Sequence, residues 1–333
     1  MSADRVLVTG GAGFIGSHLV EHLLAEGLEV RVLDDFSRGS RANLAAVGAA
    51  DCEIIDASVC DADAVHRAAK GVRWIHHLAA IPSVVESVAQ PARTNAINVE
   101  GTLHVLDAAR ASRVERVVFA SSCAIYGDGP ELPKLETLPP RPASPYALQK
   151  RTCEQYCRLY GELYALEAVP LRFFNVFGPR QDPYSDYAAV VPRFALAAVR
   201  GEAVRIYGDG GQTRDFVYVG DIARACHVAA QTAGIAGEII NVARGEATSI
   251  SELAELVGRC VGRPLAIEHF PERAGEVRDS VADTSRASGR MGFRAAVDLE
   301  EGLRRTVESF TKAELDEAAA AGARAPERRE SAR

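Results

Sequence analysis

A glycine-rich turn near the N-terminus, in the segment VLVTGGAGFIGSHL, limits this chain to few folds. Gly10, Gly13 and Gly16 directly follow a strand-like apolar run and open a segment with helical apolar spacing. The first glycine of such a trio permits a tight turn, the second lets the backbone approach a pyrophosphate, and the third allows close helix packing. The helix N-terminus then faces the phosphates. A glycine trio alone is a weak signal, but this context of strand, turn and helix predicts a dinucleotide-binding site.

The next strand-like run, EVRVLDD, indicates which dinucleotide binds. Asp34 lies at its end, and a carboxylate there accepts hydrogen bonds from a ribose 2′-hydroxyl but repels a 2′-phosphate. We therefore expect NAD rather than NADP. Arg38 leaves NADP open as the alternative, although a solvated loop charge is the simpler interpretation of that residue.

The first half of the chain alternates short β-branched runs with helix-length segments, and the runs are RVLVTG, EVRVLDD, CEIID, RWIHHLA, RVVFASS and AVPLRFF. This alternation is typical of a parallel sheet with helices on both faces. We therefore predict an α/β fold, in which a Rossmann doubly wound, mostly parallel sheet carries a smaller α/β substrate-binding lobe.

Beyond these runs the alternation loosens into GPRQDPYSDYAAVVPRF and then returns with RDFVYVGDIARACHVAA and EIINVA. We assign residues 1–174 and about 214–245 to the NAD-binding domain, and about 175–213 and 246–312 to the lobe. Residues 313–333 are rich in Ala, Glu and Arg with almost no apolar anchor, and we expect them to be a disordered tail.

Composition excludes several classes of protein. The formal net charge of −7 is spread along the chain, so no basic surface for nucleic acid is indicated. The seven cysteines include no Cys-x-x-Cys pair, which favours reduced thiols over a disulfide framework or a zinc site.

His76 and His77 lack ligand partners at suitable spacing, so we interpret them as packing or backbone-bonded residues and expect no metal. No apolar run approaches the roughly 20 residues of a membrane span, and we expect a cytoplasmic protein with no membrane partner.

The segment SPYALQK places a phenol one helical turn before an ammonium. Ser144 as N-cap and Pro145 at the first helical position would start a helix there. Tyr146 and Lys150 then share a helix face, and the lysine cation lowers the phenol pKa, which is ordinarily near 10. Such a pair occurs by chance in many helices. It gains weight from FASSCAIYG upstream, where a strand ends in hydroxyl residues at the expected ligand edge of the sheet.

At this point the sequence resembles the extended short-chain dehydrogenase/reductase superfamily and, within it, the nucleotide-sugar 4-epimerases. The resemblance covers roughly Val6 to Phe310, and the matching segments follow the family order. They are TGGAGFIGS, DDFSRGSRANL, LAA, NVEGT, SSCAIYG, SPYALQK, RFFNVFGPRQDP, IYGDGGQTRDFVYVGD and RAGEVRDSVAD.

The resemblance implies catalytic and cofactor-binding roles. Tyr146 would be the general base on the sugar 4-hydroxyl, Lys150 would hold the nicotinamide ribose, and Ser122 would share the proton. Asp56 would reach the adenine amino group, and Asn98 would support the cofactor cleft. The residues implied to bind NAD are Gly10, Gly13, Phe14, Ile15, Gly16, Asp34, Asp56, Ala79, Asn98 and Lys150.

The resemblance also implies a UDP-sugar site. Asn175 would touch the diphosphate, Tyr207 would stack on uracil, and Arg214 and Arg273 would clamp the phosphates, although surface ion pairing is the other interpretation of these arginines. Glu276 would accept from a ribose hydroxyl, where the family commonly has Asp. The implied substrate-binding residues are Ser83, Ser122, Tyr146, Asn175, Ala189, Tyr207, Arg214, Arg273, Glu276 and Ser280.

Three reactions on this scaffold, epimerisation, 4,6-dehydration and decarboxylation, begin with oxidation at C4. In the family, dehydratases have an Asp-Glu pair and UDP-glucuronate decarboxylases a Glu just after the residue that matches Ser122, where this chain has Cys123 and Ala124. The 4-ketose can then only be reduced again, so the resemblance implies an isomerase that acts as a UDP-hexose 4-epimerase in galactose metabolism. Small Ser280 matches a gatekeeper position where tyrosine excludes an N-acetyl group, so UDP-GlcNAc and UDP-GalNAc are expected beside UDP-glucose and UDP-galactose. The other interpretation of Ser280 is an ordinary loop serine.

Several alternatives stay open from the sequence. The substrate could be a UDP-uronate, UDP-pentose or dTDP-hexose, although uronate epimerases tend to have Thr where Asn175 stands. A nucleotide-sugar reductase or a non-catalytic NAD-binding regulator are further alternatives, and the regulator would be expected to lack the tyrosine or lysine that is present here. Relatives dimerise through the helix of Tyr146 and the one near Thr102, so the resemblance implies a homodimer.

Overall fold

The computed structural model describes residues 4–323 except 46, 48–51, 185–188 and 273–276, and for 317–323 only the backbone is described. At its centre is a seven-stranded sheet in the order β11-β6-β5-β4-β1-β2-β3, with every pairing parallel. The predicted α/β doubly wound fold is thereby confirmed. The strands are β1 (Arg5–Thr9), β2 (Glu29–Asp34), β3 (Cys52–Asp56), β4 (Trp74–His77), β5 (Arg116–Ser122), β6 (Glu167–Phe173) and β11 (Ile240–Val242).

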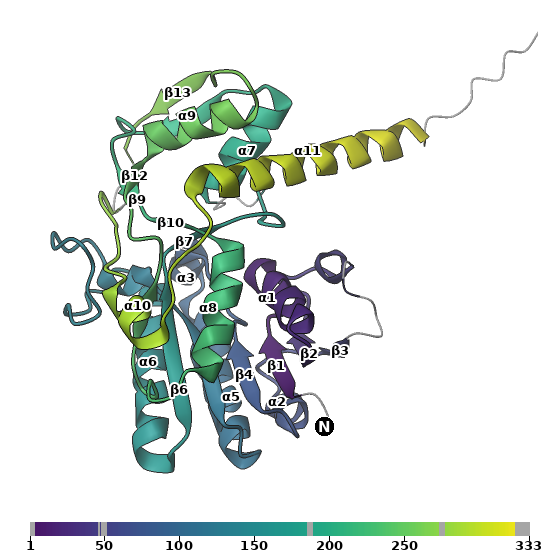
Figure 1. The fold of residues 1–333 in the computed structure, drawn as a ribbon, viewed down its shortest axis with the longest axis vertical. Helices are drawn as coiled ribbons and strands as arrows, with labels where there is room; N and C mark the ends of the chain where they lie inside the picture. Colours follow the sequence, from purple (N-terminus) through teal and green to yellow (C-terminus); the bar gives the residue numbers. More distant parts are fainter. Residues whose placement is uncertain (1–3, 46, 48–51, 185–188, 273–276, 324–333) are drawn as a thin grey trace, which may run out of the picture.

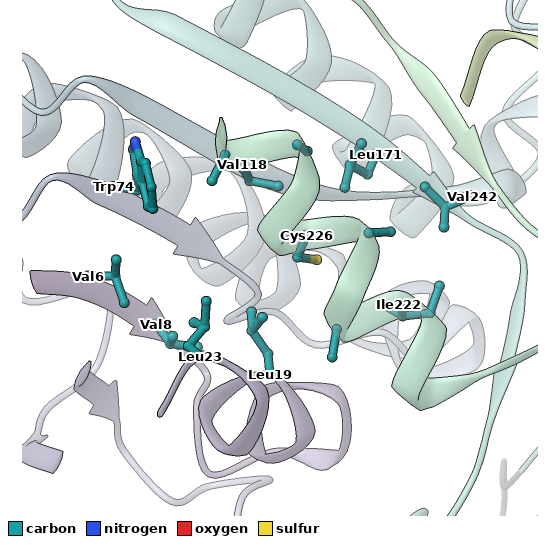
Figure 2. Close-up of a cluster of buried hydrophobic side chains, with 14 of the residues drawn as sticks. Val6, Val8, Leu19, Leu23, Trp74, Val118, Leu171, Ile222, Cys226 and Val242 are labelled. Carbon is teal, nitrogen blue, oxygen red and sulfur yellow. The ribbon is translucent and has the colours of Figure 1, made fainter. Parts of the chain in front are cut away.

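Alternate residues of the central strand β1 face opposite layers of helices. Val6 and Val8 face α1 (Phe14–Ala25) and α8 (Val219–Gln231), as Figure 2 shows. Leu7 belongs to the apolar core on the other face. Because both faces are covered, the strand reads in the sequence as a continuous apolar run. The second layer contains α2 (Ala62–Ala69), α5 (Gly101–Ala111) and α6 (Pro145–Tyr164).

Short helical segments follow the carboxyl ends of three strands. One 3₁₀ turn lies between β2 and β3 and another directly after β5. Two short helices and a π-helical turn connect β4 to α5. These segments are Arg41–Leu44, Cys123–Tyr126, α3 (Val84–Ala89), α4 (Pro91–Asn95) and Ala96–Glu100.

A smaller lobe lies above the sheet in Figure 1. Its core joins apolar side chains of three helices, among them Phe194, Leu253 and Leu303. Two-stranded ladders replace the continuous sheet here. The elements are β7 (Asn175–Phe177), α7 (Val190–Arg200), β8 (Val204–Tyr207), β9 (Thr213–Arg214), β10 (Phe216–Tyr218), β12 (Thr248–Ser249), α9 (Ile250–Cys260), β13 (Ile267–Phe270) and α11 (Leu299–Ala323).

Three segments differ from the expected division of the chain. The strand β10 pairs with β7 of the smaller lobe, although it falls in the range assigned to the NAD-binding domain. The helix α10 (Ser285–Met291) packs on β11 and adds Ala287 to the sheet core, although it falls in the range assigned to the lobe. The helix α11 continues to Ala323, so the first part of the expected disordered tail is helical. Alanine and glutamate favour helix, and Glu314 is anchored to Arg200 at 2.9 Å. Within the described residues, no helix is long and apolar enough to cross a membrane.

Candidate active site

The glycine-rich turn forms a backbone cradle at the carboxyl end of β1. Gly10 has φ +70°, and a Cβ there would lie 2.7 Å from the Ala79 backbone nitrogen. A Cβ on Gly16 would lie 2.0 Å from the Gly10 carbonyl oxygen, so only glycine permits this approach of α1 to β1. Gly13 caps α1 without a side-chain hydrogen bond, which leaves backbone N–H groups of the first turn available to an anion. The cradle fits the pyrophosphate of a dinucleotide.

The first turn of α1 also joins the two lobes. Phe14 packs against the core of the smaller lobe, and Ile15 packs against both that core and the sheet core. The cradle therefore lies at the junction between the sheet and the smaller lobe.

Asp34 is buried at the end of β2, beside the cradle. Its carboxylate accepts from the backbone nitrogens of Ala12 at 2.9 Å and Phe36 at 2.8 Å. Burial raises the Asp34 pKa, and these two donors oppose that rise. Each oxygen keeps a further lone pair for a ribose hydroxyl. Arg38 forms an ion pair with Glu86, so its charge is balanced by a carboxylate.

Two other residues expected at the cofactor site are held by protein groups. Asn98 is buried, accepts from the Ile81 nitrogen at 2.8 Å and donates to Gln149 Oε1 at 2.8 Å. It therefore ties the loop after β4 to α6, which makes it a positioning residue. Asp56 is exposed at the end of β3 and pairs with Arg41 at 2.7 Å.

Tyr146 and Ser122 meet between β5 and the start of α6. Ser144 caps this helix by accepting from the Ala147 nitrogen at 3.2 Å, as the sequence predicts. The first turn of α6 then carries the buried Tyr146, and a hydrogen-bonding interaction with Ser122 lowers the pKa of its phenol. The Tyr146 backbone nitrogen donates to Ser87 Oγ at 3.0 Å.

Lys150 lies one turn further along α6 and is buried. Its Nζ donates to the Ala120 carbonyl at 2.7 Å and lies 5.9 Å from the centroid of the Tyr146 ring. Burial lowers the Lys150 pKa to about 8. An ammonium has three N–H groups, so donors remain for a ribose hydroxyl.

Burial dominates the pKa of the phenol. It raises the Tyr146 pKa to about 12, and the hydrogen bond with Ser122 offsets only part of that rise. The net direction is opposite to the lowering by Lys150 that the residue spacing predicted. The protein without ligand therefore keeps Tyr146 as a neutral phenol at pH 7, and further positive charge is needed to favour the phenolate.

A cavity of about 840 Å³ opens between β7, α7 and β8 in the smaller lobe. Its volume lies in the usual range for small-molecule sites, about 300 to 1,000 Å³. Substrate residues expected from separate segments of the sequence line it together, namely Asn175, Ala189, Tyr207 and Arg214.

The sequence analysis missed polar residues that also line this cavity, namely Arg193, Glu202, Arg205, Gln212 and Glu268. Arg205 had a usable signal. It precedes Tyr207 by two positions on β8, and alternate strand residues share a face. The other positions depend on how distant elements pack, which no local pattern shows.

The backbone of Asp215 joins two of the cavity residues. The Asn175 side chain donates to the Asp215 carbonyl at 3.1 Å, and the next residue back is Arg214. Arg214 donates to the carbonyls of Thr213 at 2.8 Å and Arg278 at 3.0 Å. Tyr207 lies with its ring centroid 5.6 Å from that of Phe270 on the neighbouring strand.

The remaining expected substrate residues lie elsewhere. Ser83 caps α3 by accepting from the Glu86 nitrogen at 3.1 Å. Ser280 is half-buried and donates its backbone N–H to Thr213 at 3.2 Å, so it lies beside β9. Arg273 and Glu276 lie outside the described residues.

Comparison with known proteins identifies the family to which these features correspond. The model of the family described as "NAD dependent epimerase/dehydratase family" matches residues 6–243. A Mycolicibacterium smegmatis protein named UDP-glucose 4-epimerase is 42% identical over 309 residues, which are 92% of this chain and 98% of that protein.

Two solved structures share the fold over almost the full length. A UDP-N-acetylglucosamine 4-epimerase from Methanobrevibacter ruminantium, in complex with UDP-N-acetylmuramic acid, is 40% identical with a TM-score of 0.90. The match covers 94% of this chain and 100% of that one. A UDP-glucose 4-epimerase from Thermus thermophilus, in complex with NAD, is 41% identical with a TM-score of 0.84. Here the match covers 92% of this chain and 98% of that one.

Proposed function

The chain belongs to the NAD dependent epimerase/dehydratase family, and we propose that it is an NAD-dependent UDP-hexose 4-epimerase. The family and the cofactor predicted from the sequence are confirmed by this match. The observation that carries the proposed reaction is the Ser122–Tyr146–Lys150 cluster at the carboxyl end of β5, where doubly wound folds bind their ligands. Tyr146 and Lys150 are buried, and Ser122 is half-buried.

In this proposal the phenolate of Tyr146 removes the proton of the sugar 4-hydroxyl and becomes a neutral phenol, and Ser122 shares that proton through the hydrogen bond between them. Lys150 donates to a ribose hydroxyl of the cofactor and adds positive charge 5.9 Å from the phenol ring. When bound, NAD would supply the acceptor for the hydride from C4 and the donor for its return, and the positive charge of its ring would favour the Tyr146 phenolate. Tyr146 then returns the proton to the 4-keto sugar as it is reduced on its opposite face.

The residue after Ser122 favours epimerisation over dehydration or decarboxylation. Cys123 occupies that position, and burial raises the pKa of its thiol to about 12. Ala124 follows and has no acidic group. Neither side chain moves a proton at C5 or C6 near neutral pH, so the ketose can only be reduced again.

We call the seven-stranded sheet and the helices that cover it the cofactor half. In this proposal it binds NAD through the glycine cradle, Asp34 and Lys150, with Asp56 at the adenine. Asn98 positions the loop that carries Ala79 and Ile81. Because epimerisation is redox neutral, NAD stays bound through turnover. A reductase would instead need a reduced cofactor for every turnover.

The cavity of the smaller lobe binds UDP in this proposal. Tyr207 stacks on the uracil, and Asn175 and Arg214 contact the diphosphate, because all three line one space. Arg193 adds a further positive charge to the cavity. The roles of Arg273 and Glu276 stay predictions.

Hexoses with and without an N-acetyl group are the proposed substrates. The curated relative is named for UDP-glucose and the Methanobrevibacter structure for UDP-N-acetylglucosamine. Ser83, Ala189 and Ser280 are small side chains, and we assign Ser280 as the residue that admits the N-acetyl group. The homodimer, the cytoplasmic location and the expected domain boundaries also stay predictions.

The test is to incubate the untagged protein with UDP-glucose and, separately, with UDP-N-acetylglucosamine, without added cofactor, and to resolve products by anion-exchange chromatography. We expect the galacto epimer from each and none from Tyr146→Phe. No product from either substrate would refute the proposal. Consumption of added reduced cofactor would indicate a reductase instead.

The same assay tests the gatekeeper. Ser280→Tyr is expected to lose at least about tenfold in kcat/KM for the N-acetylated substrate and to keep activity on UDP-glucose, because the larger ring fills the space beside C2. Ser285→Tyr replaces an exposed serine of α10 and is the matched control. An equal loss on both substrates in Ser280→Tyr would contradict the assignment.

A further inference from the structure

The helices α1 and α8 pack side by side on one face of the sheet (Figures 1 and 2). Figure 2 shows Leu23 of α1 and Cys226 of α8 at this contact. The residues beside them in the sequence are His22 and His227. Their rings are 5.2 Å apart between centroids, and His22 Nε2 lies 3.2 Å from His227 Nδ1.

A carboxylate completes this group. Glu26 is exposed and is the C-cap residue of α1, four residues after His22. One ligand atom from each of the three side chains lies within 4.8 Å of the others. We propose that His22, Glu26 and His227 form a binding site for a divalent transition-metal ion, with Zn²⁺ as the ion that fits best.

The distances favour zinc among divalent ions. Zinc–nitrogen bonds of about 2.0 to 2.1 Å in tetrahedral geometry place two nitrogens about 3.3 Å apart. The observed separation of the two imidazole nitrogens is 3.2 Å. The exposed Glu26 side chain can rotate inward, and water takes the fourth position. Two imidazoles with one carboxylate disfavour Mg²⁺ and Ca²⁺, which prefer oxygen ligands.

Gln231 contacts the ring nitrogen of His227 that faces away from the proposed metal position. The Gln231 amide nitrogen lies 2.9 Å from His227 Nε2, so in the protein without metal this ring nitrogen accepts. The ring then carries its proton on Nδ1, which donates to His22. Metal binding at Nδ1 needs the proton on Nε2, and the Gln231 amide must turn so that its oxygen accepts. Ligating histidines commonly have such an acceptor behind them.

Two further features of the surroundings bear on the site, namely an unpartnered buried histidine on β4 and an arginine whose charge is paired. The Trp74 ring centroid lies 6.5 Å from that of His227, and His76 shares the same face of β4. Both His76 ring nitrogens are buried without a hydrogen-bond partner among the described residues. The Arg224 guanidinium on α8 is paired with Asp221 at 2.7 Å, which reduces its repulsion of a metal ion.

A metal here would join the C-terminal end of α1 to α8 and would act on stability. The phosphate cradle lies at the other end of α1, so turnover is expected to change little. The proposed metal site does not depend on the proposed reaction. The sequence analysis considered only His76 and His77 and expected no metal, whereas the ligands proposed here come from segments that only packing brings together.

The test is isothermal titration of Zn²⁺ into untagged, EDTA-treated protein in a Cys60→Ser background, because Cys60 is an exposed thiol. One ion per chain is expected, with a rise in melting temperature. His22→Gln and His227→Gln are each expected to weaken binding at least about 100-fold, whereas His66→Gln, on α2, keeps it. Equal affinity in all three variants would overturn the proposal.

Two further measurements keep the result informative if a histidine variant unfolds. Gln231→Glu places a carboxylate behind His227 and is expected to tighten Zn²⁺ binding about tenfold. Co²⁺ bound to the parent is expected to give the intense visible absorption of a four-coordinate site, and Glu26→Gln to change that spectrum. Weaker binding by Gln231→Glu, or a Co²⁺ spectrum unaffected by Glu26→Gln, would contradict the assigned ligands.

Discussion

The cofactor half and the smaller lobe build their sites in different ways. The cradle is formed by backbone atoms, and the Gly10 carbonyl oxygen leaves room only for a hydrogen at the Cβ position of Gly16. In the lobe, a cavity of about 840 Å³ is lined by side chains from short strands and helices. The first site is closely packed before any ligand binds, whereas the second is an open space lined by both polar and apolar side chains.

This difference indicates how each half should respond to change. A closely packed backbone turn leaves no room for an added atom, and neighbouring backbone cannot move as a side chain can. A cavity lined by side chains can lose one contact and keep its shape. Substitutions in the cradle should therefore affect folding, and those in the cavity should affect substrate binding alone.

The largest expected effect is that of Gly16→Ala. Its methyl group would overlap the Gly10 carbonyl, so we expect a loss of about 3 kcal/mol or more in the free energy of unfolding, with loss of bound NAD. Urea unfolding and the cofactor absorbance of the purified protein measure both. Gly289→Ala, where no atom lies within 4 Å of the added Cβ, is the control and should be neutral or slightly stabilising. Equal stability of the two variants would show that the cradle is not closely packed.

Acid should destabilise the protein through a buried histidine of the central sheet. Burial, with a smaller effect of Lys150, lowers the His77 pKa from 6.5 to about 3, so only the unfolded chain binds a proton between these values. Stability is therefore complete above about pH 6.5 and falls as the pH decreases, by about 2 kcal/mol between pH 6.5 and 5 for this histidine. Urea unfolding followed by Trp74, the single tryptophan, measures it. His77→Gln should reduce the loss by that amount, and an unchanged pH dependence would refute it.

The lobe should respond to acid in the opposite direction. Burial raises the Asp215 pKa from 3.8 to about 6, although backbone N–H groups of Arg244, Gly245 and Ala282 oppose the rise. The folded state then binds the proton more tightly, so this contribution is complete below about pH 3.8 and is lost as the pH rises through 6. Asp215→Asn should therefore steepen the acid-induced loss of stability, measured by urea unfolding between pH 4 and 7. A shallower loss would contradict this sign.

The smallest expected effect is that of Tyr207→Ala in the cavity. Stacking on a base contributes about 1 to 3 kcal/mol, so we expect a rise of about tenfold in KM with kcat unchanged. Steady-state kinetics with UDP-glucose measure it. Tyr184→Ala removes an exposed ring whose hydroxyl interacts with Arg200 and should leave KM unchanged. A fall in kcat or in unfolding free energy for Tyr207→Ala would remove the contrast between the two halves.

Much of the cofactor half could be predicted because its signals are local. The glycine spacing, the Ser144 cap and the Tyr146–Lys150 pair each lie within a few residues, where strand and helix geometry set relative positions. The strand-like runs also indicated the parallel sheet, because strands buried on both faces read as apolar runs.

The tertiary structure alone decided features that join distant segments. It placed Arg193 and Tyr207 in the lining of one cavity, and His22 of α1 beside His227 of α8. It also decided the Tyr146 pKa, since the spacing showed a nearby cation but not the burial that outweighs it. Local spacing determines which side chains share a face of one element. Packing determines what lies opposite that face and how much water remains there.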